Sequence, residues 1–184
     1  MQRNIVFLVD SSRSMNIKTG KESHFKKAIQ AIEKVFACPD SALSDVYVSV
    51  VFFWDDLFKG FRTEPVYQWV PLNSAIDPKK LVEFGEPPSL AGTSLDQGLN
   101  YAIKFLEGKQ GEKIIKLVTD SAVNAQKTRD KNKFTLLEKE IRFDCIAITQ
   151  RRNSFSQEVI GVSRLGQTFE ESEVDAIAKD LLFP

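Results

Sequence analysis

The sequence contains few of the residues that build the commonest catalytic and metal centres. It has two cysteines and one histidine in 184 residues. Cys38 and Cys145 are far apart in sequence and fit neither a metal knuckle nor a disulfide framework, so nothing requires an oxidising compartment. The lone histidine, His24, has no nearby motif that would complete a Ser/Asp triad. We predict that it is a surface residue at the start of a helix.

Net charge and long apolar runs are also absent. Lys and Arg together number 25, as do Asp and Glu, so the formal net charge is zero. Proteins that bind nucleic acid through attraction to phosphate need a basic surface, and we therefore expect no nucleic-acid partner. The N-terminal apolar run, Ile5–Val9, is too short for a signal-peptide core or a membrane span. We expect no membrane partner and a cytoplasmic location.

The composition is that of a globular protein, with 42% hydrophobic and 27% charged residues. The length is close to that of one ordinary domain, and no linker rich in Pro, Gly or Ser divides the chain. No Gly-rich phosphate loop of the P-loop or Rossmann type is present. We predict one domain over residues 1–184, acting as a monomer or as a subunit of a hetero-complex.

Apolar runs alternate with segments of helical periodicity. Continuous apolar runs are typical of strands that are covered on both faces of a parallel sheet, and they occur at Ile5–Val9, Val46–Trp54, Ile114–Val118 and Ile141–Thr149. Helices are expected at Phe25–Phe36, Leu95–Leu106, Lys133–Glu140, Gln157–Leu165 and Glu173–Leu182. This alternation predicts an α/β, doubly wound fold with a mostly parallel central sheet and helices on both faces.

One segment departs from the parallel pattern. Phe58–Leu72 contains Pro65 and Pro71, and proline is tolerated at sheet edges. We predict an edge strand antiparallel to Val46–Trp54. Strand alternation would place Tyr67 and Trp69 on one shared face, where burial in the core is favoured over a partner surface.

Three polar loops carry the candidate site. Asp10, Ser12 and Ser14 directly follow the first predicted strand, Thr93 precedes a predicted helix, and Asp120 follows the strand that ends at Val118. In an open parallel sheet, functional loops gather beyond the carboxyl ends of the strands. If the three loops meet there, the site holds two carboxylates and several hydroxyls, with no imidazole and no thiol.

These ligand types suit a hard cation. Oxygen donors favour Mg²⁺, or Mn²⁺ or Ca²⁺, over Zn²⁺, and a divalent ion would compensate the two crowded carboxylates. Each residue also has a purely structural explanation. Thr93 could cap a helix in a capping box with Asp96, the serines could hydrogen-bond within a turn, and Asp120 could close a loop.

The three loops together resemble a known family. Asp10-x-Ser12-x-Ser14 is similar to the DxSxS signature of von Willebrand factor A domains, and Gly92-Thr93-Ser94-Leu95-x-x-Gly98-Leu99 is similar to the threonine loop of that family. Thr119-Asp120 resembles its aspartate-bearing third loop. The resemblance extends over essentially the whole chain.

The resemblance implies a metal-ion-dependent adhesion site (MIDAS). Ser12 and Ser14 would contact the metal through their hydroxyls, Thr93 would join in the ligand-competent state, and Asp10 and Asp120 would act directly or through water. One coordination position would remain for an Asp or Glu of a partner protein. The chain departs from the family at Arg13 and Ser121, where glycine is common.

Other functions remain open on the sequence. A metal-dependent phosphatase or nuclease using Asp10 and Asp120 is the main alternative, although it would need further acids, for which Asp55, Asp56 and Asp96 are the obvious recruits. A metal-free scaffold of the same fold is another. We expect a protein-binding module that is not an enzyme. Its size resembles short, stand-alone intracellular bacterial members of the family, including those associated with tellurium resistance.

Overall fold

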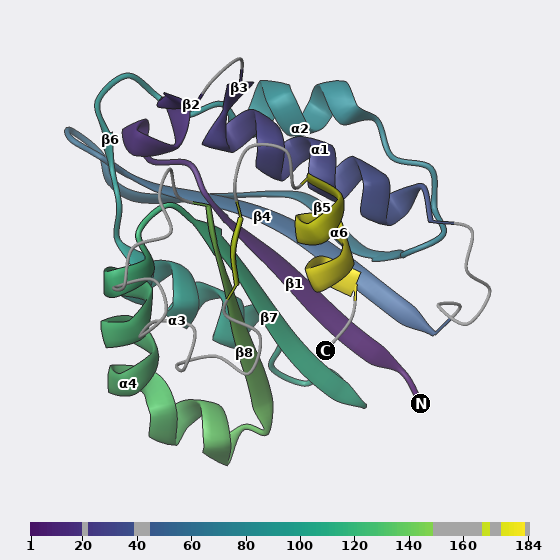
Figure 1. Ribbon diagram of the computed structural model, residues 1–184. Helices are drawn as coiled ribbons and strands as arrows, with labels where there is room; N and C mark the ends of the chain where they lie inside the picture. Colours follow the sequence, from purple (N-terminus) through teal and green to yellow (C-terminus); the bar gives the residue numbers. More distant parts are fainter. Residues whose placement is uncertain (20–21, 39–44, 149–166, 170–173, 183–184) are drawn as a thin grey trace.

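The computed structural model describes residues 1–19, 22–38, 45–148, 167–169 and 174–182. Within these ranges the chain forms a twisted, mostly parallel sheet with helices on both faces (Figure 1). The predicted α/β, doubly wound fold is thereby confirmed. No helix among the described residues is both long and apolar enough to span a membrane.

The main sheet has the strand order β5-β4-β1-β7-β8-β9. The four predicted core strands are present as β1 (Arg3–Asp10), β4 (Val46–Asp56), β7 (Glu112–Thr119) and β8 (Ile141–Ile148). They are parallel to one another, as is β9 (Gln167–Phe169). Because β1 lies between β4 and β7, the loop that follows Asp10 begins near the centre of the sheet, where it has neighbours on both sides.

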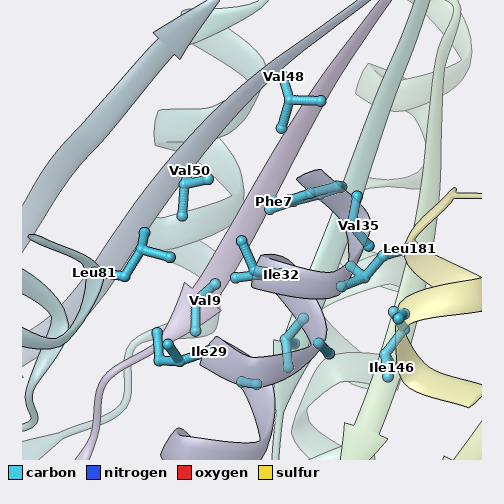
Figure 2. Packing of buried hydrophobic residues seen from close by; sticks show 14 of the residues in the cluster. Phe7, Val9, Ile29, Ile32, Val35, Val48, Val50, Leu81, Ile146 and Leu181 are labelled. Atoms are coloured by element: carbon cyan, nitrogen blue, oxygen red, sulfur yellow. The ribbon is translucent and has the colours of Figure 1, made fainter. Parts of the chain in front are cut away.

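Alternate residues of each strand enter two separate cores. Phe7 and Val9 face α1 (His24–Phe36), α2 (Pro78–Gly85) and α6 (Val174–Leu182). Figure 2 shows this packing, in which Ile29, Ile32 and Val35 of α1 lie over the sheet. Val6 and Leu8 face the opposite side, toward α3 (Leu95–Phe105) and α4 (Ala122–Glu138). Burial on both faces explains why these strands are continuous apolar runs.

The antiparallel edge strand is also confirmed, as β5 (Gly60–Pro71) paired with β4. The prediction that Tyr67 and Trp69 share one face is wrong. Tyr67 packs against the α1 side of the sheet and Trp69 against the α3 side, where its ring stacks on Phe105. The β4–β5 register shifts near Val50, and Trp69 has a positive φ of 52°. An irregularity of this kind breaks the two-residue alternation on which the prediction rested.

Several other elements differ from their predicted bounds. α4 begins at Ala122 and not near Lys133, because its first half is polar and shows no apolar stripe. α2, the short strand β6 (Ala91–Gly92) and the hairpin β2 (Lys18–Thr19) with β3 (Glu22–Ser23) were not predicted. The helix predicted at Gln157–Leu165 lies outside the described residues.

Candidate metal centre

The first loop of the site leaves the sheet at the carboxyl end of β1. Asp10 is the last residue of β1, and its side chain is fully buried. Its Oδ1 accepts a hydrogen bond of 2.8 Å from the backbone N–H of Ser12. The neighbouring Ser11 donates through its hydroxyl to the carbonyl of Gly85 at 2.9 Å. The loop is therefore held both by Asp10 and by the end of α2, before it enters the 3₁₀ helix η1 (Arg13–Asn16).

A chain of hydroxyls joins the first loop to the third. The Oγ atoms of Ser12 and Ser14 are 3.0 Å apart, and the Ser14 hydroxyl donates to Oδ1 of Asp120 at 3.0 Å. Asp120 directly follows β7, the neighbour of β1. The two loops are 106 residues apart in sequence and meet because their strands are adjacent and parallel.

The second loop completes the cluster. The Thr93 hydroxyl lies 3.5 Å from both carboxylate oxygens of Asp10. The helix that follows has Ser94 as its N-cap, with no side-chain capping bond, so the alternative in which Thr93 caps the helix is wrong. The structure thus brings together all five residues predicted from the sequence: Asp10, Ser12, Ser14, Thr93 and Asp120.

Sequence reasoning gave no role to Thr119, the last residue of β7. Its hydroxyl donates to Oδ2 of Asp10 at 2.7 Å and accepts a bond of 3.0 Å from the backbone N–H of Ser121. The side chain is fully buried. It fixes the rotamer of Asp10 and shapes the third loop. The sequence did offer one indication of this role. Thr119 lies between an apolar strand and Asp120, and a buried threonine at a strand end needs a hydrogen-bond partner.

His24 contradicts two predictions. It begins α1, as expected, but its side chain is only 5% exposed, and its Nδ1 lies 3.8 Å from Oδ2 of Asp120. An imidazole therefore borders the site, although none was expected there. Neither ring nitrogen has a hydrogen-bond partner among the described residues. No local motif marks this residue, because the tertiary packing of α1 against the third loop is what brings it near Asp120.

The electrostatics of the site are dominated by burial. Removal from water raises the pKa of Asp10 from 3.8 to about 6, against the lowering effect of the hydrogen bonds from Thr119 and Ser12. The charge of Asp120 raises this pKa further. No Lys or Arg among the described residues forms an ion pair with Asp10. Its charge is therefore not compensated by the part of the chain that the structure describes, and a bound cation would compensate it.

The donor set fits a hard divalent ion. It consists of two carboxylates and three hydroxyls in mutual contact, and oxygen donors of this kind suit Mg²⁺, Mn²⁺ or Ca²⁺. Within the described residues, no group of three or more His, Cys, Asp and Glu side chains has an arrangement suited to a metal. The described residues therefore form a site with few acids and no nitrogen or sulfur ligands.

The geometry agrees with a comparison over the whole chain. The sequence profile of the von Willebrand factor type A domain matches residues 4–180. The chain belongs to this family. The von Willebrand factor A (vWA) family consists of metal-dependent adhesion and protein-interaction modules. No curated protein matches the chain.

Solved structures of vWA-like proteins share the fold. BatB from Bacteroides thetaiotaomicron superposes with a TM-score of 0.65 at 18% identity, covering 98% of this chain and 97% of BatB. The manganese-loaded TRAP protein of Plasmodium vivax gives 0.60 at 19% identity, covering 98% and 73%. The pilus adhesin SpaC of Lactobacillus rhamnosus GG gives 0.68 at 12% identity, and there the match covers 98% of this chain and 30% of SpaC.

The two departures from the vWA pattern leave the cluster intact. Arg13 is exposed and lines a hollow of about 600 Å³ together with Ser12, Ser14 and Thr93. Ser121 donates its backbone N–H to Thr119, and its hydroxyl accepts from the Asn124 amide at 2.8 Å. Arg13 thus adds positive charge beside the site, and Ser121 is the N-cap residue of α4.

Proposed function

We propose that this chain is a divalent-metal-dependent protein-binding module. Asp10, Ser12, Ser14, Thr93 and Asp120 would hold Mg²⁺ or Mn²⁺, and an Asp or Glu of a partner protein would complete the coordination. The observation that carries the proposal is the fully buried Asp10, which faces a second carboxylate and has no described basic partner. We also propose a cytoplasmic location.

The arrangement of the ligands supports binding of an external acid. Oδ1 of Asp10 accepts from the Ser12 N–H, and Oδ2 accepts from the Thr119 hydroxyl. Asp10 therefore holds the serine loop in place at the end of β1. The hydroxyls of Ser12 and Ser14 are neutral donors, and when bound, the ion would keep much of its positive charge for a partner carboxylate. The manganese-loaded state of the structurally similar TRAP protein makes Mn²⁺ a suitable probe.

Binding is favoured over hydrolysis by the state of the other acids. The carboxylate of Asp56 accepts from the backbone N–H groups of Phe58 and Lys59, at 2.9 and 3.0 Å. Asp96 is paired with Lys131. Two of the three acids that a metal-dependent phosphatase or nuclease would recruit are therefore engaged elsewhere.

Calorimetric titration with Mn²⁺ alone tests the metal site. We expect one ion per chain for the wild type and at least a hundredfold weaker binding by Asp10→Asn. Asp96→Asn is the matched control, because it removes the same charge near the site without removing a proposed ligand, and it should change the affinity by less than about threefold. Equal losses in both variants, or no binding by the wild type, would contradict the proposal.

Two further measurements separate binding from catalysis. Capture of partners from native lysate should require Mg²⁺ and should be abolished both by EDTA and by Asp10→Asn. A panel of phosphoesters should give no Mg²⁺-dependent turnover above that of Asp10→Asn. Turnover by the wild type alone would support the hydrolase, whereas capture that is indifferent to EDTA would support a metal-free scaffold.

A further inference from the structure

Exposed apolar side chains lie on the same edge of the sheet as the metal centre. β4 is parallel to β1, so the β4–β5 turn projects from the edge at which Asp10 and Asp120 lie (Figure 1). Within this turn Leu57 is 69% exposed and Phe58 is 84% exposed. Large apolar residues that gather at one exposed place mark an interaction surface more often than isolated ones do.

The turn that presents these residues is defined by hydrogen bonds. Oδ1 of Asp56 accepts from the backbone N–H groups of both Phe58 and Lys59. Gly60 then adopts a positive φ of 70°, which closes the turn into β5. A turn held in this way keeps Leu57 and Phe58 at the edge of the sheet and out of the core, so their exposure is part of the fold.

The short strand β6 connects this turn to the metal centre. β6 is antiparallel to the end of β4, with Asp55 opposite Gly92 and Asp56 opposite Ala91. Leu57 directly follows Asp56, and Leu90, which is 53% exposed, directly precedes Ala91, so the two leucines flank this pair. Thr93 follows β6 directly. An apolar patch of Leu57, Phe58 and Leu90 therefore borders the loop that supplies a proposed metal ligand.

A hollow beside the metal centre has a positively charged side chain in its wall. Its volume is about 600 Å³; Ser12, Ser14 and Thr93 form part of its wall, and Ala91 and Gly92 connect that wall to the apolar patch. Arg13 is the one charged residue that lines it, and no ion pair of Arg13 is formed with the described residues. Among the described residues, the lining thus has one guanidinium without an ion pair and no carboxylate, which suits an anionic occupant.

We infer that this surface binds an acidic peptide segment in which a bulky apolar residue lies close to the metal-binding carboxylate. The inference rests on the proposed function, because the carboxylate would occupy the metal's open position. Arg13 would contact a second acid, and the apolar side chain would pack on Leu57, Phe58 and Leu90. Thr93 and Leu90 are three residues apart and therefore at most roughly 10 Å from each other, so the apolar residue would lie within about three residues of the acid.

Selection from a displayed library of random twelve-residue peptides, on the Mg²⁺-loaded protein, tests the inference. We expect enrichment of sequences with an Asp or Glu about three residues from Leu, Ile, Phe, Tyr or Trp, often with a second acid. A synthetic copy of an enriched peptide should bind at least tenfold more weakly to Leu57→Ser/Phe58→Ser and about fivefold more weakly to Arg13→Gln. Phe134→Ser is the control, since it removes another exposed aromatic residue, on α4.

Titration of the same variants with Mn²⁺ separates this inference from the proposed function. All of them should bind Mn²⁺ as the wild type does, because none of these side chains is a proposed ligand. No enrichment, enrichment without the apolar residue, or equal peptide binding by Leu57→Ser/Phe58→Ser would overturn the inference while Mn²⁺ binding persists. Failure of the wild type to bind Mn²⁺ would overturn the proposed function itself.

Discussion

The central sheet buries a carboxylate at two places, at the end of β1 and within β8. Asp144 of β8 is almost fully buried, and its Oδ2 accepts bonds from Lys116 Nζ at 2.8 Å and from Arg142 Nε and Nη2 at 3.1 and 3.0 Å. Asp10 is buried to the same degree, but its donors among the described residues are all neutral and come from Ser12, Thr93 and Thr119. Within the described part of the chain, one carboxylate has basic partners and the other has none.

The difference separates a structural acid from a functional one. A buried charge that has no basic partner is costly, and it persists where something outside the chain supplies the opposite charge. The charge of Asp144 is compensated, because Lys116 lies opposite it in the β7–β8 register, although its buried Oδ1 has no hydrogen-bond partner among the described residues. Asp10 instead lies beside a second carboxylate and three hydroxyls, which is the environment of a cation site. The comparison makes opposite predictions for the two residues.

The largest expected effect is at the compensated pair. Lys116→Met should lower the free energy of unfolding by about 3–4 kcal/mol, because it leaves Asp144 buried with Arg142 as its remaining described basic partner. Urea denaturation followed by circular dichroism measures this. Adding Asp144→Leu in the same chain should restore most of the loss, since an apolar pair of similar volume replaces the ion pair. If Lys116→Met alone were as stable as the wild type, Asp144 would not depend on Lys116 for charge compensation, and the distinction between Asp144 and Asp10 would fail.

The next effect is the pH dependence of the metal-free protein. The pKa of Asp10 is raised from 3.8 to about 6, so the folded state holds this proton more tightly than the unfolded state. The contribution of Asp10 to stability is then greatest below pH 4 and is lost as the pH rises through 6, by roughly 2–3 kcal/mol. In EDTA, the wild type should lose this amount relative to Asp10→Asn between pH 4 and pH 7.

Metal should reverse that loss. Mg²⁺ at a hundred times its dissociation constant should stabilise the wild type at pH 7 by about 2.7 kcal/mol and leave Asp10→Asn unchanged. Asp144→Asn serves as the contrast, because it should be destabilised at pH 7 both with and without Mg²⁺. A wild-type pH profile in EDTA that runs parallel to that of Asp10→Asn would show that Asp10 is not the uncompensated group.

The parallel core could be predicted from the sequence, as could the clustering of the five candidate residues at one edge of the sheet. Strands buried on both faces must be apolar throughout, so the runs at Ile5–Val9 and Ile114–Val118 mark β1 and β7 within a few residues. Polar residues directly after such strands cannot enter the core, and adjacent parallel strands bring them to one edge. The order of the strands therefore brings Asp10 and Asp120 together.

The rest depends on tertiary packing that no local pattern records. Among the described side chains of α4, those buried before Lys133 are Ala125, Thr128 and Asn132, which have helical spacing but include two polar residues, so no apolar stripe marks the helix. The bulge that turns Trp69 to the other face is not marked in the sequence of β5. His24 follows an ordinary helix cap at Ser23, whose side chain accepts from the Lys26 N–H, and nothing local indicates that Asp120 lies beside it.

A smaller effect is expected at the hydroxyl that links the loops of the uncompensated site. Ser14 contacts both Ser12 and Asp120, so Ser14→Ala should weaken Mn²⁺ binding about tenfold, close to 1.4 kcal/mol. Ser11→Ala is the matched control. That hydroxyl bonds to Gly85 and faces away from the cluster, so its loss should lower stability by about 1 kcal/mol and leave Mn²⁺ affinity unchanged. If Ser11→Ala weakened Mn²⁺ binding and Ser14→Ala did not, Ser14 would not be a metal ligand.

The smallest effect tests whether His24 compensates the charge of Asp120, as Lys116 compensates that of Asp144. Its Nδ1 lies 3.8 Å from Asp120, beyond hydrogen-bonding distance, and neither ring nitrogen has a described partner. His24→Phe keeps an aromatic ring, which is slightly larger, and removes both nitrogens. It should therefore change the free energy of unfolding by less than about 1 kcal/mol, whereas His24→Ala, which leaves a cavity, should cost about 2 kcal/mol. If His24→Phe instead destabilised the protein as strongly as Lys116→Met, the imidazole would be a basic partner of Asp120, and the metal site would be partly compensated by the chain itself.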